Sequence, residues 1–296
     1  MKMKFVKKIG LVTLGFALVF GFSSCSSKKE FNAKKSITVL SREEGSGTRG
    51  AFIELFGIEK KDSTGKKVDY TTTEAMITNS TAVMTTSVSS DLYAIGYVSL
   101  GFLNPQVKGL QIDSVKPTVE NIKSGKYKIV RPFNIVINPN ELSESAKDFI
   151  SFILSKQGQQ VLVDNGFIDV SSNYEYLPIK TNFEKVVIAG SSSISPVMEK
   201  IKEVYEVFQP NAKIEIQQSD SSTGISSVKS GVCDIGMSSR DLKSSEKDNK
   251  ILATIIAQDG IAVIVNQNNP VTNLSSNEIC EIFTGNILEW ENLIEK

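Results

Sequence analysis

A recurring unit constrains the fold of this chain more than any other feature. A short apolar segment is followed by a turn of small hydroxyl residues and glycine, and then by a segment of helical spacing. Segments of strand length and helix length that alternate in this way predict an α/β fold with mainly parallel strand pairing. Four strand-to-helix turns of this type are expected, at Ser46–Thr48, Ser191–Ser193, Ser221–Gly224 and Ser238–Arg240.

Other segments are assigned from their apolar spacing and composition. Residues 143–166 predict a long amphipathic helix, with Ser143 as its N-cap and Gly166 at its C-terminal end. Residues 171–185 are polar and irregular and predict a connector, whereas the charged residues 240–250 predict a solvated surface. Strands are predicted at residues 36–41, 131–139, 186–189 and 259–270.

The N-terminus has the order of an export signal. A basic start, an apolar run of about fourteen residues and the segment "SSCSSKKE" follow one another, and the run is shorter than the ~20 residues of a membrane-spanning helix. "FSSC" resembles a bacterial lipobox, so residues 1–25 are expected to be a lipoprotein signal peptide, with lipid on Cys25 and a tether over 26–35. An ordinary signal peptide that contains a cysteine is the alternative. Either way the protein is expected outside the cytoplasm, and lipidation would anchor it to the outer face of the cell membrane.

Composition removes several classes of function. Lys+Arg and Asp+Glu both number 33, which argues against a nucleic-acid-binding protein, because such proteins carry a basic excess. The chain has no histidine, and its three cysteines have no CxxC spacing, so neither a metal site nor a cofactor is expected.

The turns have the chemistry of an anion site. A helix N-terminus presents unpaired N–H groups, glycine lets an anion approach them, and serine or threonine adds a hydroxyl donor. Arg42 lies beside the first turn and can bind two oxygens at once, with Glu43 or Glu44 holding its guanidinium. The alternative for each single turn is a plain helix cap, because serine and threonine are favoured N-caps. A nucleotide loop is excluded, since "EGSGTR" lacks the ending of a P-loop and no GxGxxG follows a strand.

Specific motifs carry a resemblance to a known family. The motifs are "SREEGSGTR", "AIGYVSLG", "AKDFISFILSKQGQ", "AGSSSISPVMEKI", "DSSTGISSVKSG", "DIGMSSRDL", "DGIAVIVNQNNP" and "EIFTGNILEW". With these motifs the chain resembles the phosphate-binding lipoproteins of bacterial ABC phosphate importers over nearly all of residues 36–296. This resemblance implies a two-lobe, hinged α/β fold of the type II periplasmic-binding-protein class, a phosphate ion between the lobes, no catalysis, a monomer, and delivery to the permease subunits of an importer.

The order of these motifs differs from the family order. The segment like "AGSSSIS" comes first in the family, whereas this chain opens with the family's middle and late segments. This order is interpreted as a circular permutation. One lobe is then expected from residues 36–130 plus 266–296 and the other from 131–265, with two strands crossing between them.

The resemblance also implies roles for individual residues. Glu44 matches the carboxylate that holds the arginine, and some members have an aspartate where Ser239 stands, which accepts the proton of hydrogen phosphate. Selection of phosphate over sulfate or molybdate is therefore left open, as is a sensor role; a phosphatase-like enzyme is disfavoured without histidine. The expected anion-binding residues are Arg42, Ser46, Gly47, Thr48, Ser192, Ser193, Ser221 and Ser239.

Overall fold

The computed structural model describes residues 30–179 and 183–294. The expected signal peptide over residues 1–25, the lipidation site Cys25 and the start of the 26–35 tether lie outside these ranges. Within the described ranges, none of the helices has the length and apolar character needed to cross a membrane.

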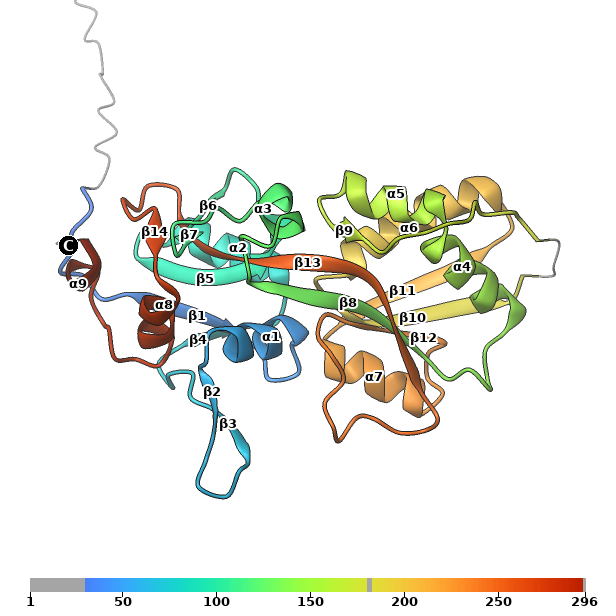
Figure 1. Ribbon diagram of the computed structural model, residues 1–296, viewed down its shortest axis with the longest axis horizontal. Coiled ribbons are helices and arrows are strands. Elements are labelled where there is room, and N and C mark those ends of the chain that lie inside the picture. The colour runs from blue at the N-terminus through green and yellow to red at the C-terminus, as the bar shows by residue number, and fades with distance from the viewer. Residues whose placement is uncertain (1–29, 180–182, 295–296) are drawn as a thin grey trace, which may run out of the picture. The chain divides into compact units, whose positions relative to one another are not determined.

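Helices and strands are interspersed along the chain, and several strands lead directly into a helix, as the recurring unit predicts (Figure 1). The strands are β1 (Thr38–Arg42), β2 (Glu59–Lys61), β3 (Lys67–Asp69), β4 (Met76–Thr78), β5 (Ala94–Ser99), β6 (Val107–Gly109), β7 (Gln111–Ile112), β8 (Val130–Ile137), β9 (Ile168–Asp169), β10 (Lys185–Ser191), β11 (Lys213–Ser219), β12 (Ile235–Ser238), β13 (Leu252–Asn266) and β14 (Asn273–Leu274). The helices are α1 (Gly47–Leu55), α2 (Thr81–Ser90), α3 (Val119–Lys123), α4 (Glu144–Leu154), α5 (Lys156–Asp164), α6 (Ser195–Phe208), α7 (Ser221–Lys229), α8 (Ser276–Phe283) and α9 (Glu291–Ile294), with a 3-10 turn at Leu100–Phe102.

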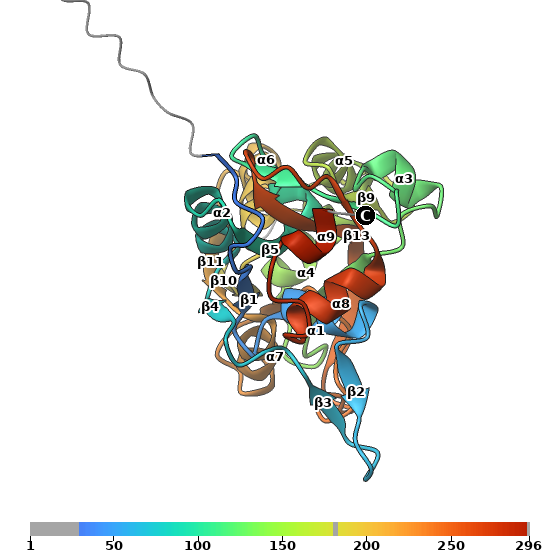
Figure 2. The same cartoon turned by 90° about the vertical axis from the view of Figure 1, so that its left-hand side faces the viewer.

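The main sheet has the strand order β11-β10-β12-β8-β13-β5-β1-β4. Strands that lead into the hydroxyl-rich turns pair in parallel, β1 with β4 and β5, and β10 with β11 and β12. However, β8 and β13 pair antiparallel with each other and with their outer neighbours β12 and β5. The prediction of mainly parallel pairing was therefore wrong for the centre of the sheet. A short β2–β3 hairpin lies apart from this sheet and projects from the first half of the chain (Figure 2).

Two groups of buried side chains define two lobes. One core draws on residues 37–129 and 261–290, and the other on residues 133–257. We call residues 31–130 with 260–294 the first lobe and the described part of 131–259 the second lobe. β13 pairs with β8 and β9 in its first half and with β5 and β6 in its second, so it runs through both lobes beside β8 (Figure 1). The cores change membership between Ala257 and Ile261, a few residues before the expected boundary at Val265.

The predicted helix over residues 143–166 is two helices. Ser143 caps α4 as expected, but α4 ends at Leu154 and α5 begins at Lys156. Ser155 separates them because its extended backbone ends α4, while its Oγ accepts from the N–H of Gly158 and caps α5. The amphipathic pattern continues through the break, so spacing alone cannot reveal it.

The fourth turn is also different from the prediction. β12 ends at Ser238 and leads into a loop, not a helix. Arg240 in this loop is 6% exposed, and its guanidinium makes two 2.7 Å hydrogen bonds to Glu246 and one of 2.9 Å to Ser222. The charged stretch 240–250 is therefore not uniformly solvated, because its first residue is folded under the loop.

The irregular connector, expected over residues 171–185, is fastened to the second lobe by a buried carboxylate. Asp148 of α4 accepts hydrogen bonds from Tyr176 at 2.6 Å, from Tyr205 at 2.7 Å and from Gln209 at 3.1 Å. Burial and the neighbouring carboxylate raise the pKa of both tyrosines, so their hydroxyls stay protonated as donors. The connector is thus held at Tyr176, although its described residues 171–179 lie outside any helix or strand.

We expect Tyr176→Phe to lower the free energy of unfolding by about 1.5–3 kcal/mol, because it removes a buried hydrogen bond to a charged acceptor. Tyr174→Phe is the matched control, since its hydroxyl binds the carbonyl of Ser151 from a side chain that is 44% exposed. Urea denaturation of both variants measures the difference. Equal stability of the two variants would show that the Asp148 contacts do not hold the connector.

Candidate anion-binding site

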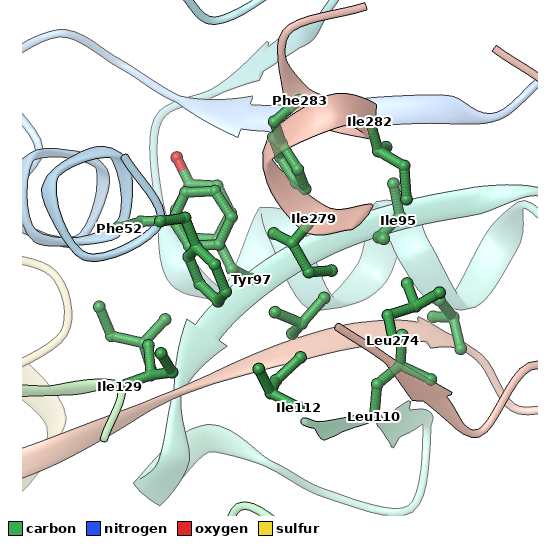
Figure 3. Packing of buried hydrophobic residues seen from close by; sticks show 14 of the residues in the cluster. Phe52, Ile95, Tyr97, Leu110, Ile112, Ile129, Leu274, Ile279, Ile282 and Phe283 are labelled. Atoms are coloured by element: carbon green, nitrogen blue, oxygen red, sulfur yellow. The ribbon is translucent and has the colours of Figure 1, made fainter. Parts of the chain in front are cut away.

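Arg42 is placed by the core of the first lobe. It is the last residue of β1 and is 2% exposed. The Tyr97 hydroxyl accepts from its backbone N–H at 3.1 Å and bonds with the Ser41 hydroxyl at 2.8 Å. The Tyr97 ring stacks on Phe52 of α1 (Figure 3), and the two ring centroids are 3.9 Å apart. Apolar packing therefore fixes the backbone from which the guanidinium extends.

The guanidinium is held by a carboxylate at its base. Nε of Arg42 donates to Glu43 at 2.8 Å, and Nη2 donates to the other Glu43 oxygen at 2.6 Å. The expectation that Glu44 has this role is corrected: Glu44 is exposed, and the structure places Glu43 against Arg42. The two hydrogen bonds to Glu43 fix the orientation of the Arg42 guanidinium, and the carboxylate offsets much of its positive charge.

Hydroxyls from both lobes meet at the guanidinium. Arg42 donates to Ser192 of the second lobe at 3.0 Å and to Thr81 of the first lobe at 3.3 Å. Ser193 lies 2.8 Å from the Thr48 hydroxyl and 3.2 Å from that of Thr81. All five side chains are buried. Residues 150 positions apart in the sequence thus form one polar cluster.

A second set of hydroxyls continues the cluster beside α1. Ser239 lies 3.0 Å from Ser191 and 3.4 Å from Ser221, and its N–H donates to the Ser221 hydroxyl at 3.1 Å. A Cβ on Gly47 would lie 2.5 Å from the Ser239 hydroxyl and nearer still to that of Ser221. Gly47 therefore lies directly against this set, where a larger residue would not fit.

The cap interpretation applies to only part of the cluster. Ser46 is the N-cap of α1, since its Oγ accepts from the Arg49 N–H at 3.3 Å. In contrast, the N-cap of α6 is Ile194, without a side-chain hydrogen bond, so the hydroxyls of Ser192 and Ser193 are not caps. They are directed to Arg42, Thr48 and Thr81 instead. Two residues that meet here, Thr81 and Ser191, were not among the expected anion-binding residues, although Ser191 lies in the second expected turn.

Thr81 had a signal that could have identified it. It begins α2 directly after the N-cap Ser80, so the "NST" turn before this helix has the same hydroxyl chemistry as the four expected turns. The strand before it, β4, has only three residues, which is why the pattern of apolar strand and turn is weak there.

The mouth of the cluster lies between the lobes. A pocket there is lined by Glu43, the partner of Arg42, with Asn79 and Ser80 of the first lobe and by residues 218–220 of the second. Among the described residues no group of acidic, cysteine or histidine side chains is arranged to hold a metal ion. Hydroxyls around a fixed guanidinium can surround a small oxyanion, with donors for each of its oxygens.

A buried ion pair joins the crossing strands behind the cluster. Arg131 of β8 donates to Asp259 of β13 at 2.9 and 3.0 Å, and the two residues are direct neighbours in the strand register. Arg131 also donates to the carbonyl of Ser239 at 3.3 Å, and Ser99 donates to Asp259 at 2.9 Å. Burial lowers the pKa of Arg131 and raises that of Asp259, and each shift is opposed by the other's charge. The pair therefore links the site to the strands between the lobes.

Two lobes, with a cluster of hydroxyls around a guanidinium between them, define a substrate-binding protein of the two-lobe class. The family model of the PBP superfamily domain matches residues 26–157 and 178–295. The chain belongs to this superfamily and, within it, to the family of phosphate-binding proteins named PstS.

Similar proteins cover almost the whole chain. The phosphate-binding protein PstS 2 of Streptococcus agalactiae is 52% identical over 98% of this chain and 99% of its own length. The PstS 2 protein of Streptococcus pneumoniae is 42% identical over 98% of this chain and 100% of its own. A crystal structure of a phosphate-binding protein of a phosphate ABC transporter from Streptococcus pneumoniae superposes with a TM-score of 0.68 at 44% identity, covering 87% of this chain and 99% of that chain.

Proposed function

We propose that this protein captures inorganic phosphate between its two lobes and delivers it to the permease subunits of an ABC importer. The observation that carries the proposal is the contact of Arg42 in the first lobe with Ser192 in the second, inside a buried cluster of hydroxyls. Phosphate offers four oxygens to such donors, and binding across the interface rewards closure of the lobes. The anion-binding residues in this proposal are those expected from the sequence, with Thr81 added.

The protein acts outside the cytoplasm as a monomer and performs no catalysis. The basic and apolar start of the sequence supports export, and Cys25 is the residue proposed to carry the lipid that anchors it to the membrane. The cluster offers a guanidinium and hydroxyls but no histidine to activate a nucleophile, since the chain contains none. These features support a receptor in preference to a phosphatase.

A receptor for another tetrahedral oxyanion, such as sulfate or molybdate, is the second candidate. The observation that favours it is Ser239, whose hydroxyl lies among Ser191 and Ser221 where an acidic side chain would repel an unprotonated anion. A hydroxyl both donates and accepts, so it discriminates less between hydrogen phosphate and sulfate.

We also propose that the chain, which has the same segment order as the PstS 2 proteins, is circularly permuted relative to PstS proteins such as that of Bacillus subtilis. The PstS protein of Bacillus subtilis is 36% identical over 112 residues, which is only 37% of its length. Such a partial match is expected when two segments have exchanged their order, because a single alignment can then follow only one of them. In addition, Ser36 pairs with Glu289, and the Glu291 N–H donates to the Ala33 carbonyl at 2.8 Å. The first and last described segments therefore lie together, which supports a break at that surface; Lys296 itself lies outside the described residues.

Isothermal titration with phosphate, sulfate and molybdate tests the proposed function. We expect saturable 1:1 binding of phosphate, tighter than that of the other two oxyanions. Sulfate or molybdate binding with no heat from phosphate would establish the second candidate instead. Hydrolysis of a phosphomonoester by the purified protein would contradict a pure receptor.

A further inference from the structure

Gly45 lies directly against a side chain of the opposite lobe. A Cβ built on Gly45 would stand 2.5 Å from Cγ of Asp220 and closer still to its Oδ1, distances that real non-bonded atoms do not adopt. Gly45 belongs to the first lobe and Asp220 to the second. The backbone of Gly45 is not left-handed, so alanine is compatible with the local conformation of its own lobe. Only the approach of the second lobe requires glycine here.

Asp220 cannot turn away at low cost. It is the N-cap of α7: Oδ1 accepts from the Thr223 N–H at 2.9 Å and Oδ2 accepts from the Thr223 hydroxyl at 2.6 Å. Beside it, the Ser222 N–H donates to the Gly45 carbonyl at 3.2 Å, which is a direct backbone contact between the lobes. The space above Gly45 is thus filled by a side chain fixed by its own helix.

Gly50, near the start of α1, also lies against a side chain of the second lobe. A Cβ there would lie 3.0 Å from Cδ of Arg240, whose guanidinium is fixed by Glu246 and Ser222. Ser222 takes part in both contacts, because its N–H meets Gly45 and its hydroxyl accepts from Arg240. Gly45, Gly50, Asp220, Ser222 and Arg240 form a closure contact next to the hydroxyl cluster.

We propose that this closure contact sets how far the lobes close, and so determines anion affinity without touching the anion. Gly45 is its critical position and acts as a positioning residue, since a side chain there would hold Asp220, and with it Ser221, away from Arg42 and Gly47. The inference rests on the proposed function, that an oxyanion binds between the lobes. The hydroxyls of both lobes converge within hydrogen-bond distance, so a small separation disrupts several contacts at once.

Gly45→Ala is the primary test. We expect its dissociation constant for phosphate to rise about tenfold to a hundredfold, because the closed state becomes rare and small misplacements remove aligned contacts. Without phosphate its melting temperature should match that of the wild type, since each lobe accepts alanine there. The rise in melting temperature on adding phosphate should shrink accordingly.

Asp220→Gly in the same chain provides the rescue. Glycine is an acceptable N-cap, so this change alone should weaken α7 only slightly. The double variant Gly45→Ala with Asp220→Gly adds a methyl group on the first lobe and removes the side chain that it would meet on the second. We expect it to bind phosphate within about threefold of Asp220→Gly alone. Additive losses in the double variant would overturn the proposal, as would wild-type affinity of Gly45→Ala.

Two readouts separate this proposal from the proposed function. If the wild type binds another oxyanion in place of phosphate, the same four proteins are titrated with that ion and the same rescue is expected. If it binds no oxyanion, the proposed function fails, and small-angle X-ray scattering decides the closure proposal: Gly45→Ala should have a larger radius of gyration than the wild type, and the double variant should not. Equal radii in that case would overturn it.

Discussion

Arg42→Ala is expected to weaken phosphate binding by about tenfold to a hundredfold, more than removal of any single hydroxyl. Its guanidinium contacts hydroxyls from both lobes, Thr81 and Ser192, and charge-assisted hydrogen bonds contribute roughly 1.5–3 kcal/mol against ~1 for neutral pairs. The variant also leaves the Glu43 carboxylate unpaired at the mouth, where it repels an anion. Isothermal titration of wild type, Arg42→Ala and Ser46→Ala measures the ranking.

Two further variants separate these contributions. Arg42→Lys keeps the charge but loses the paired donors, so its affinity should lie between those of the wild type and Arg42→Ala. Glu43→Gln combined with Arg42→Ala removes the repulsion and should recover part of the loss. Glu44→Ala is the matched control, since Glu44 is exposed and the arginine is held by Glu43. A loss from Ser46→Ala as large as that from Arg42→Ala would contradict the assignment.

Asp259→Asn should lower the free energy of unfolding by about 3–5 kcal/mol, a large part of the 5–15 kcal/mol typical of a folded protein. The reason is the environment of its partner: the side chains of Arg131 and Asp259 are 1% and 0% exposed, so loss of the carboxylate leaves a buried guanidinium without its counter-charge. Denaturation in urea gives this difference, provided that the slope of the unfolding free energy against urea concentration is the same for the variant and the wild type.

The apolar replacement of both partners is the control for this effect. Arg131→Met with Asp259→Leu removes both charges together, and such exchanges are often neutral or stabilising. We expect this double variant to be more stable than Asp259→Asn, yet to bind phosphate more weakly, because Arg131 also holds the carbonyl of Ser239. A stability of Asp259→Asn within ~1 kcal/mol of the wild type would mean that the pair is not a buried, coupled unit.

The sequence predicted those parts of the fold that depend on neighbouring residues. The strand before Arg42 and the helix after Ser46 are both present, because apolar spacing and hydroxyl caps are local signals. The α/β class followed from the same alternation. The break at Ser155 was missed because the apolar face continues across it, and a single capping serine decides it.

Long-range contacts could not be predicted in the same way. Whether Glu43 or Glu44 pairs with Arg42 depends on how the chain turns after β1. The sequence cannot distinguish them, because both are glutamates next to the same turn. Arg240 is charged and lies in a charged stretch, so only the tertiary contacts to Glu246 and Ser222 show that it is buried. The antiparallel centre of the sheet likewise depends on the pairing of β8 with β13. These strands are far apart in the sequence, since the paired residues Arg131 and Asp259 are separated by 128 positions.

A crystal structure of the protein grown with arsenate tests the central claim most directly, because arsenic is a tetrahedral phosphate analogue whose anomalous scattering locates the anion. The account predicts one strong peak between the lobes, within hydrogen-bond distance of the Arg42 guanidinium and of the hydroxyls of Ser192 and Ser193. A peak elsewhere on the molecule, with Arg42 still bonded to Ser192 and no anion between them, would contradict it.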